Sequence, residues 1–357
     1  MSSRPDRLAG LLPDAGVDVL LVTGSFNVRY LTGYTGSNGI ALIGADTRLF
    51  VTDFRYVEQA SKEVDPSFER RRSAQDLLES VGEVLAAGEL RLGFESAHMS
   101  VRAHGRLRER LPDRIELVGV EGLVEGLRAV KEPAEVAAIR AAAALADEAF
   151  AELIAGGLTG HTERELATAL EFGMRRRGAS GPSFEPIVAG GPQGALPHGR
   201  PRDEPVRAGE LVVVDWGALL DGYCSDCTRT LATGAIGPEA TEVYRLVLDA
   251  QLAAVEDVKP GAVGREVDAV ARAAITAAGH GEQFGHGLGH GVGLEVHEAP
   301  RLAQPSDAVL APGNVVTVEP GVYIPGRFGV RIEDLVVVTE AGCDILTSIS
   351  KALTVVD

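Results

Sequence analysis

The sequence predicts a two-domain fold, with an α/β domain over residues 1–125 and an α+β domain over residues 126–357. The chain has 357 residues, a length that suggests two domains, or one large domain with a smaller one. Short apolar runs alternate with turn signals in the first part of the chain, which is α/β patterning. A long helical segment then begins at Pro133, and strand-like runs dominate between and after the later helices.

The first domain is predicted to contain short strands separated by helical pieces. Strands are expected at DVLLVT, IALIG and RLFVT and near residues 91–94 and 115–118. Helical pieces are expected at residues 27–31, 56–64 and 74–87. The charged clusters at residues 69–72 and 106–110 are interpreted as solvated faces.

The second domain is predicted to begin with a long helix at Pro133. Proline is harmless in a first turn, because the N–H that it lacks would have no helical partner there. The stretch EVAAIRAAAALADEAFAELIA that follows is rich in strong helix formers. Three more helices are expected at residues 163–177, 239–255 and 264–278, and the domain boundary is placed near residues 125–132.

The composition disfavours several classes of function. Lys and Arg number 34 against 51 Asp and Glu, and the net charge of −17 disfavours nucleic acid and anionic membranes as partners. No run of about 18 apolar residues predicts a membrane span. Pro13 and Asp14 interrupt the amino-terminal apolar stretch, so no signal peptide is expected and the default location is cytoplasmic. Neither a G-x-G-x-x-G nor a P-loop motif occurs, which argues against a nucleotide-binding protein.

Cys224 and Cys227 form a C-x-x-C spacing. If their segment is a strand, residues three apart point to opposite faces, so the two thiols can neither pair nor share a metal. We interpret both as small buried or near-surface residues. The chain has three cysteines, which fits a reducing compartment.

The segment LVVVDWGALLDGYCSDCTRT is predicted to form a β-hairpin with Asp221-Gly222 as its turn. That turn places Asp215 opposite Thr228. Asp226 then shares the face of Asp215 and lies diagonal to it, about 5–8 Å away. Gly217 has no side chain and is expected to leave a hole beside Asp226. Two aspartates around one hole could hold metal ions.

Three further candidate ligands lie in glycine-rich or apolar segments. Alternate glycines around His290 disfavour a helix and allow the backbone to approach another strand or a ligand closely. Glu319 directly precedes a Pro-Gly turn at the end of an apolar run. Glu333 shares one strand face with Arg331, an alternation that is also typical of a solvent-exposed face.

Asp215, Asp226, His290, Glu319 and Glu333 together predict a two-metal hydrolase. Carboxylates within apolar runs are costly to bury unless they are paired or bind a metal. Two divalent cations would balance about four negative charges, with the imidazole as a neutral ligand. Oxygen-rich ligation favours manganese, with cobalt and zinc as alternatives.

These residues lie in segments that resemble the pita-bread metallopeptidases, specifically the Xaa-Pro peptidases aminopeptidase P and prolidase. The matching segments are LPHG at 196–199, VVVDWG at 212–217, YCSDCTRT at 223–230, GHGVGLEVHE at 289–298, VEPGVY at 318–323 and VRIED at 330–334. The first half resembles the creatinase-type amino-terminal domain through NVRYLTGYTGSNG and TDFRY. The resemblance implies a creatinase-like, ribonuclease H-like first domain and a pita-bread catalytic domain.

The resemblance implies a role for each metal ligand. Asp226 and Glu333 would bridge the two cations, Asp215 would be a further ligand, and His290 would bind one cation. Glu319 would bind a cation and also carry a proton from the attacking water to the leaving nitrogen.

The resemblance also implies roles for five residues around the ligands. His198 and His297 would hydrogen-bond the substrate and the tetrahedral intermediate. Thr228 and Arg331 would orient the two bridging carboxylates. Arg301 would face the carboxylate of a dipeptide substrate, although a solvated surface arginine is an equal alternative.

The implied activity is hydrolysis of the Xaa-Pro bond in proline-containing peptides by a homodimer. Aminopeptidase P activity on longer peptides and prolidase activity on dipeptides both remain open. Methionine aminopeptidase-like activity and a non-catalytic interaction module on the same fold are the alternatives. The full ligand set argues against a creatinase, which works without metals.

Overall fold

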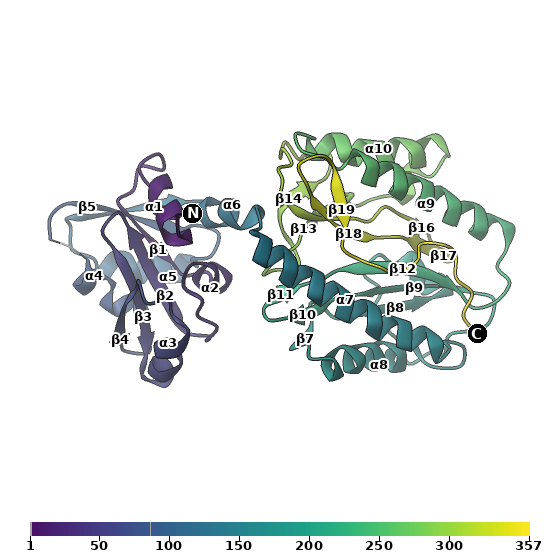
Figure 1. Ribbon diagram of the computed structural model, residues 1–357, viewed down its shortest axis with the longest axis horizontal. Helices are drawn as coiled ribbons and strands as arrows, with labels where there is room; N and C mark the ends of the chain where they lie inside the picture. The colour runs from purple at the N-terminus through teal and green to yellow at the C-terminus, as the bar shows by residue number, and fades with distance from the viewer. Residues whose placement is uncertain (1, 86) are drawn as a thin grey trace. The chain divides into compact units, whose positions relative to one another are not determined.

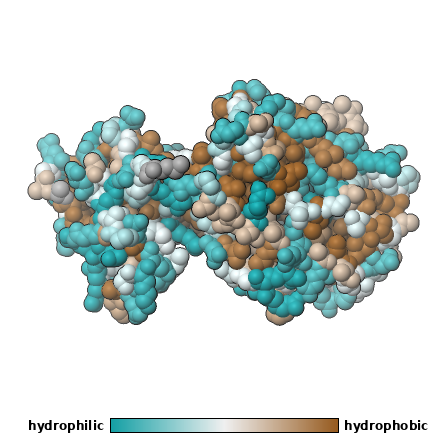
Figure 2. All heavy atoms as spheres, viewed as in Figure 1, coloured by the Kyte–Doolittle hydropathy of each residue, from teal (hydrophilic) through white to brown (hydrophobic). Residues whose placement is uncertain are grey.

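The computed structural model describes residues 2–85 and 87–357. The chain folds as two compact units, Met1–Arg128 and Ala129–Asp357, which we call unit 1 and unit 2. Each has its own hydrophobic core. Polar side chains cover much of the surface seen in Figure 2, with hydrophobic residues showing as patches between them.

Unit 1 is a mixed sheet with helices packed around it (Figure 1). Its described residues form six strands in the order β4-β3-β2-β1-β5-β6. Their bounds are β1 Val19–Val22, β2 Gly39–Gly44, β3 Arg48–Asp53, β4 Glu69–Ser73, β5 Leu90–Glu95 and β6 Ile115–Val120. The helices are α1 Arg4–Leu11, α2 Ser25–Thr32, α3 Val57–Glu63, α4 Val81–Val84, α5 Val101–Arg110 and α6 Leu123–Ala129. The predicted α/β class of the first domain is therefore confirmed.

Two details of unit 1 differ from the sequence prediction. The helix expected over residues 74–87 is wrong in extent: a 3₁₀ turn at Leu77–Ser80 leads into the short helix α4, and Leu85 is already extended. Residue 86, in the predicted last turn, lies outside the described residues. Helix α1 was not predicted, although Ser3 and Asp6 form a capping box that marks its start.

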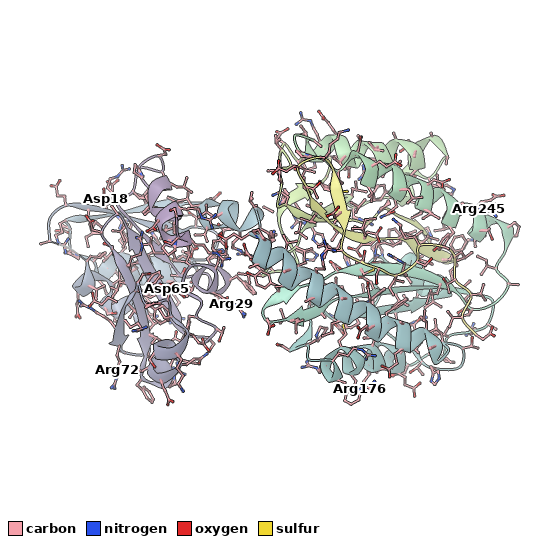
Figure 3. All side chains as sticks on the ribbon, in the orientation of Figure 1. Asp18, Arg29, Asp65, Arg72, Arg176 and Arg245 are labelled. Atoms are coloured by element: carbon pink, nitrogen blue, oxygen red, sulfur yellow. The ribbon has the colours of Figure 1, made fainter. Side chains whose placement is uncertain are left out.

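The charged cluster at residues 69–72 forms most of strand β4, at the edge of the sheet. Its side chains are exposed, and Figure 3 shows Arg72 pointing away from the sheet. A charged edge strand discourages pairing with another chain. The interpretation as a solvated face is confirmed.

Unit 2 consists of antiparallel sheets flanked by two helix pairs (Figure 1). The helices are α7 Pro133–Ala155, α8 Glu163–Arg176, α9 Pro238–Asp257 and α10 Gly264–Ala277, as predicted to within three residues at each end. Helices α7 and α8 share one core with β8 Ile187–Gly190 and β9 Leu211–Trp216. Helices α9 and α10 share a second core with the sheet that ends the chain.

Two sheets of unit 2 position the residues of interest. One has the order β12-β9-β8, with β12 at Cys227–Ala232. The other has the order β14-β13-β15-β18-β19. Its bounds are β13 Gly289–Gly291, β14 Glu298–Leu302, β15 Val315–Val318, β18 Asp334–Val338 and β19 Cys343–Ile345. The remaining strands are β7 Gly181–Pro182, β10 Ala218–Leu220, β11 Tyr223–Cys224, β16 Gly321–Ile324 and β17 Phe328–Arg331.

The predicted hairpin forms with the predicted register. Asp221 and Gly222 both have positive φ, 49° and 84°, as a type I′ turn requires. Asp215 pairs with Thr228 across β9 and β12. The expected hole at Gly217 is not there, because the Ser225 carbonyl oxygen occupies the position that a Cβ at Gly217 would take. Gly217 therefore serves close backbone approach.

We expect Gly222→Ala to lower the free energy of unfolding of unit 2 by about 1–2 kcal/mol, the cost of a left-handed backbone for an L-residue. The single tryptophan, Trp216, is buried on β9 of this hairpin, so its fluorescence during urea denaturation reports the loss. Gly285→Ala is the matched control, since a Cβ there meets nothing within 4 Å and φ is not positive. Equal stability of the two variants would contradict the argument.

Cys224 and Cys227 are both buried, and they pack in different hydrophobic clusters. This confirms that their spacing is not a shared site. Among the described helices, none is long and apolar enough to cross a membrane.

Candidate active site

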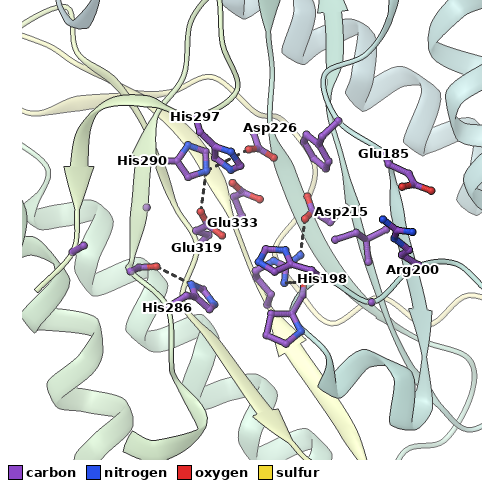
Figure 4. Close-up of a pocket in the computed structure, with 18 of the residues that line it drawn as sticks. Glu185, His198, Arg200, Asp215, Asp226, His286, His290, His297, Glu319 and Glu333 are labelled. Carbon is purple, nitrogen blue, oxygen red and sulfur yellow. Dashed lines mark hydrogen bonds and ion pairs between the residues drawn. The ribbon is translucent and has the colours of Figure 1, made fainter. Parts of the chain in front are cut away.

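A cavity of about 560 Å³ in unit 2 gathers the candidate residues (Figure 4). Its wall includes all five predicted metal ligands and four of the other predicted site residues: Asp215, Asp226, His290, Glu319, Glu333, His198, His297, Arg301 and Arg331. Thr228 lies behind this wall and contacts it through its hydroxyl group. The structure thus brings together residues spread over 136 positions of the sequence, from 198 to 333.

The hairpin supplies Asp215 and Asp226 to the cavity. Asp215 lies near the end of β9, and Asp226 directly precedes β12. Together with Glu333, each offers a carboxylate oxygen, and these three atoms lie within 4.8 Å of one another. The apolar neighbours of Asp215 on β9 face the core under α7, where Trp216 stacks on Phe150 at 3.9 Å between ring centroids.

His290 reaches the cavity from β13, where glycines let the strands approach closely. A Cβ at Gly289 would overlap the Thr317 carbonyl oxygen, and one at Gly291 would overlap that of Ala299. The expectation of close backbone approach is confirmed. Glu319 follows β15, and its backbone N–H donates to the Leu288 carbonyl at 2.8 Å, which fixes it beside His290.

Glu333 precedes β18 and is 1% exposed, while Arg331 is 3% exposed. The alternative that these two residues form a solvated strand face is therefore wrong. Both faces of this segment are buried, because Val330 and Ile332 pack in the α9–α10 core while Arg331 and Glu333 line the cavity.

Crowding of the carboxylates perturbs their pKa values. Burial raises the pKa of Asp226 well above its usual range, and the negative charges of Glu333, Asp215 and Glu319 raise it further. Burial and the charges of Glu319 and Asp215 also raise the pKa of Glu333 well above its usual range. Without cations, such a cluster is unfavourable in its ionised form.

Glu319 has the opposite shift. Burial raises its pKa, but hydrogen bonding to His290 and the positive charges around it outweigh burial and lower the pKa to about 2. Its Oε1 lies 3.2 Å from His290 Nε2 and accepts a hydrogen bond from Thr317 Oγ1 at 3.0 Å.

The donor set fits divalent cations. Asp215 Oδ1 and Glu333 Oε1 are buried without a hydrogen-bond partner among the described residues. His290 Nδ1 faces the Gly291 carbonyl at 3.1 Å and so carries a hydrogen, which leaves Nε2 free to bind a cation when the imidazole is neutral. His290 Nε2 lies 3.2 Å from Glu319 Oε1 and 3.7 Å from Asp226 Oδ2, an arrangement that needs a cation or a proton between the groups.

Unit 1 contains another acidic group with a histidine: Glu95, His98 and Glu125. Its oxygens are already engaged. Glu95 accepts hydrogen bonds from the Thr23 and Gly24 backbone and from Asn27, and Glu125 accepts from Asn27 and faces His98 at 2.8 Å. The unit 2 cavity is therefore the better candidate for metal binding.

Arg331 contacts a carboxylate other than the two expected, whereas Thr228 contacts one of those two. Thr228 donates to Glu333 Oε2 at 2.7 Å, and Arg331 pairs with Asp215 at 2.6 Å. The expected carboxylates were Asp226 and Glu333, so the contact of Thr228 with Glu333 agrees with the expectation and that of Arg331 with Asp215 does not. The reason is the crossing of β17 over the hairpin, which points the guanidinium toward β9 while Thr228 Oγ1 lies between it and Glu333.

His198, His297 and Arg301 line the cavity around the carboxylates. His297 packs edge-on against His290, with 4.3 Å between ring centroids. Burial, His290 and Arg301 lower the pKa of His297 to about 4, so its imidazole is neutral at neutral pH. Arg301 pairs with His290 across β13 and β14 and is exposed at the cavity, so it is both solvated and placed to meet a ligand.

Sequence reasoning assigned no role to His286 or Tyr323. The Tyr323 hydroxyl accepts from Arg331 at 2.8 Å and lies 3.0 Å from His286 Nε2. Tyr323 ends the matching segment VEPGVY, and His286 lies in a histidine-rich segment. These two features were the signals that the sequence offered. Phe184 and Ile187 form an apolar wall that no motif indicated, because only the pairing of β8 with β9 brings them beside Asp215.

Comparison with known proteins places this site in a family. A model described as metallopeptidase family M24 matches residues 137–340, and one described as the creatinase/prolidase N-terminal domain matches residues 4–130. Uncharacterized peptidase YqhT of Bacillus subtilis is 44% identical, over 98% of each chain. The structure of an Xaa-Pro dipeptidase from Bacillus anthracis superposes with a TM-score of 0.95 at 42% identity, over 99% of each chain. The structure of an X-Pro aminopeptidase from Thermotoga maritima superposes with a TM-score of 0.89 at 38% identity, over 99% of this chain and 100% of that chain.

Both family models and the full-length structural similarity agree with the fold class predicted for the two domains. The chain therefore belongs to metallopeptidase family M24 and, within it, to the Xaa-Pro peptidases of the pita-bread fold.

Proposed function

We propose that the protein is a two-metal-dependent exopeptidase that hydrolyses the Xaa-Pro bond at the amino terminus of peptides or in dipeptides. The observation that carries the metal site is the pair of buried carboxylate oxygens, on Asp215 and Glu333, that lack a hydrogen-bond partner among the described residues. With Asp226, His290 and Glu319 they form the proposed ligand set. Bound cations would supply Lewis-acid activation of a water molecule and of the scissile carbonyl.

The chain's own residues would complete the reaction. Glu319 is ionised at neutral pH and borders the cavity, so it is placed to accept the proton of the attacking water and pass it to the leaving nitrogen. The neutral imidazole of His297 can donate one hydrogen bond to the oxyanion, and His198 can donate another from the opposite wall. Arg331 would hold Asp215, and Thr228 would hold Glu333.

The preference for proline rests on the family and on the chemistry of the bond. An Xaa-Pro bond is a tertiary amide without an N–H, which suits a dedicated pocket for the ring. Phe184, Ile187 and Pro197 give the cavity an apolar wall beside Asp215. The substrate's α-amine would lie near the carboxylates, which limits cleavage to chain ends.

The test is hydrolysis of Ala-Pro, Ala-Pro-Ala and Ala-Ala-Ala by the manganese-loaded protein, with Asp226→Ala as control. We expect cleavage at the Ala-Pro bond, no cleavage of Ala-Ala-Ala, and no activity in the variant. The ratio of the hydrolysis rates of Ala-Pro and Ala-Pro-Ala distinguishes dipeptidase from aminopeptidase activity. Cleavage of Met-Xaa peptides instead would support a methionine aminopeptidase, and no cleavage with metal bound would reject the assignment.

Arg301 is the proposed clamp for the carboxylate of a dipeptide. We expect Arg301→Ala to lower kcat/KM for Ala-Pro by about 10-fold or more, the worth of a lost charge-assisted hydrogen bond, and to leave Ala-Pro-Ala less affected. Steady-state kinetics with both peptides measures the difference. Arg327→Ala, which alters an exposed arginine outside the cavity, is the control. Equal effects on both peptides would contradict a carboxylate clamp.

We also propose manganese as the native cation, a cytoplasmic location and a homodimer. Oxygen-rich ligation supports manganese, with cobalt or zinc as alternatives. The chain has three cysteines, a number that fits a reducing compartment. The homodimer follows from the family resemblance, and a mass near 37.4 kDa in light scattering would contradict it.

A further inference from the structure

The proposed ligands come from two different sheets. Asp215 and Asp226 belong to the hairpin of the β12-β9-β8 sheet. The other three ligands belong to or adjoin strands of the β14-β13-β15-β18-β19 sheet: His290 lies on β13, Glu319 directly follows β15 and Glu333 directly precedes β18. The distances between the ligands therefore depend on how these sheets meet. They meet where β12 runs beside the segment that leads into β18 (Figure 1).

Arg229 lies on β12 at this junction, on the face turned away from the cavity. Its neighbour Thr228 faces the cavity, and strand side chains alternate. Arg229 is 2% exposed, so its charge is almost fully removed from water. A charge buried to this extent needs partners on every side.

The Arg229 guanidinium joins the two sheets directly. Its Nη1 donates to the Thr228 carbonyl at 2.9 Å and also to the Glu333 carbonyl. Its Nε donates to the Ser350 carbonyl at 3.0 Å, which ties in the carboxy-terminal segment. Glu333 lies between strands β17 and β18. The Arg229 side chain therefore supplies its backbone carbonyl with a hydrogen bond that a neighbouring strand would otherwise give.

Asp334 completes the junction. It is 1% exposed and accepts from Arg229 Nη2 at 2.9 Å, from Lys351 Nζ at 2.6 Å and from Gln251 Nε2 at 3.1 Å. Thr347 Oγ1 donates to Asp334 Oδ1, the oxygen that Arg229 also contacts, at 3.0 Å. Because Asp334 directly follows Glu333, fixing Asp334 also fixes the backbone of the proposed bridging ligand.

We infer that Arg229, through its pair with Asp334, is a positioning residue that sets the spacing between the two halves of the metal site. It touches neither the cavity nor a ligand carboxylate. It acts through the backbones of Thr228 and Glu333, from behind the sheet. The inference rests on the proposed function, since it concerns the cations that the five ligands would hold.

The test is manganese binding by Arg229→Lys and Asp334→Asn, measured by calorimetric titration well below the unfolding temperature and by electron paramagnetic resonance. Lysine keeps the charge but lacks the fork that reaches Glu333 and Asp334 together. We expect manganese affinity to fall ~10–100-fold, as for other residues that support metal ligands, and the spectrum of a coupled manganese pair to be lost. Glu239→Gln, which breaks an exposed ion pair with Arg327, should change neither.

A merely structural role predicts a different result. In that case the unfolding midpoint of Arg229→Lys falls, but its folded form binds manganese with wild-type affinity and an unchanged spectrum, which would overturn the inference. If Arg229→Lys does not fold, Lys351→Met replaces it, because this side chain is 18% exposed and holds Asp334 from the edge. Lys351→Met should also lower the manganese affinity, and a wild-type affinity in this variant would overturn the inference. A wild-type protein that binds no manganese would overturn the proposed metal site and this inference together.

Discussion

Asp226→Asn is expected to abolish peptidase activity while leaving the fold intact. Asparagine has the same shape but no charge, so it is a poor bridge between cations. Their Lewis-acid contribution is several kcal/mol and each 1.4 kcal/mol is a factor of ten, so we expect kcat/KM to fall by at least about 10³-fold. Manganese content per chain should fall with it.

The same variant should not destabilise the metal-free protein. The pKa of Asp226 is raised by burial and by the charges of Glu333, Asp215 and Glu319, so its ionised form opposes folding near neutral pH. This destabilisation is present at pH values above the pKa of Asp226 in the unfolded chain and is lost as the pH falls. Asparagine carries no charge and therefore removes the destabilisation at every pH. The matched control is Asp221→Asn in the turn of the same hairpin, which should keep full activity. An active Asp226→Asn enzyme would contradict the ligand assignment.

Arg331→Met is expected to cost the metal-free protein about 3 kcal/mol or more in the free energy of unfolding. Arg331 is 3% exposed and pairs with Asp215, and removing one partner of a buried pair leaves the other charge uncompensated. Saturating manganese should reduce this loss, because cations at the site would again face Asp215. Urea denaturation followed by Trp216 fluorescence measures both conditions.

Tyr323→Phe is the control for Arg331→Met. It removes the hydroxyl that accepts from Arg331 but keeps the ion pair, so the expected loss is about 1 kcal/mol. A loss for Arg331→Met that is equally large with and without manganese would argue that cations do not bind beside Asp215.

Local sequence signals predicted the parts of the site that depend on local geometry. The Asp221-Gly222 turn determines the hairpin register, and the register in turn places Asp215 opposite Thr228. Alternate glycines predicted the close strand contacts around His290. Helices α7 to α10 followed from runs of helix-forming residues and proline at helix starts.

Contacts between sheets could not be predicted in this way. The pairing of Arg331 with Asp215 depends on how β17 crosses β9, which no local pattern encodes. Gly217 looked like one side of a hole, yet the Ser225 carbonyl oxygen fills the space. Arg229 gave no signal either, because an arginine between two threonines on a strand has the pattern of an exposed residue.

The most direct test of the two-metal site is an anomalous diffraction measurement on crystals soaked in manganese. We expect two anomalous peaks in the cavity of unit 2, both next to the carboxylates of Asp226 and Glu333, with His290 beside one of them. Peaks at Glu95, His98 and Glu125 instead, or a cavity without a peak in crystals saturated with manganese, would contradict the account.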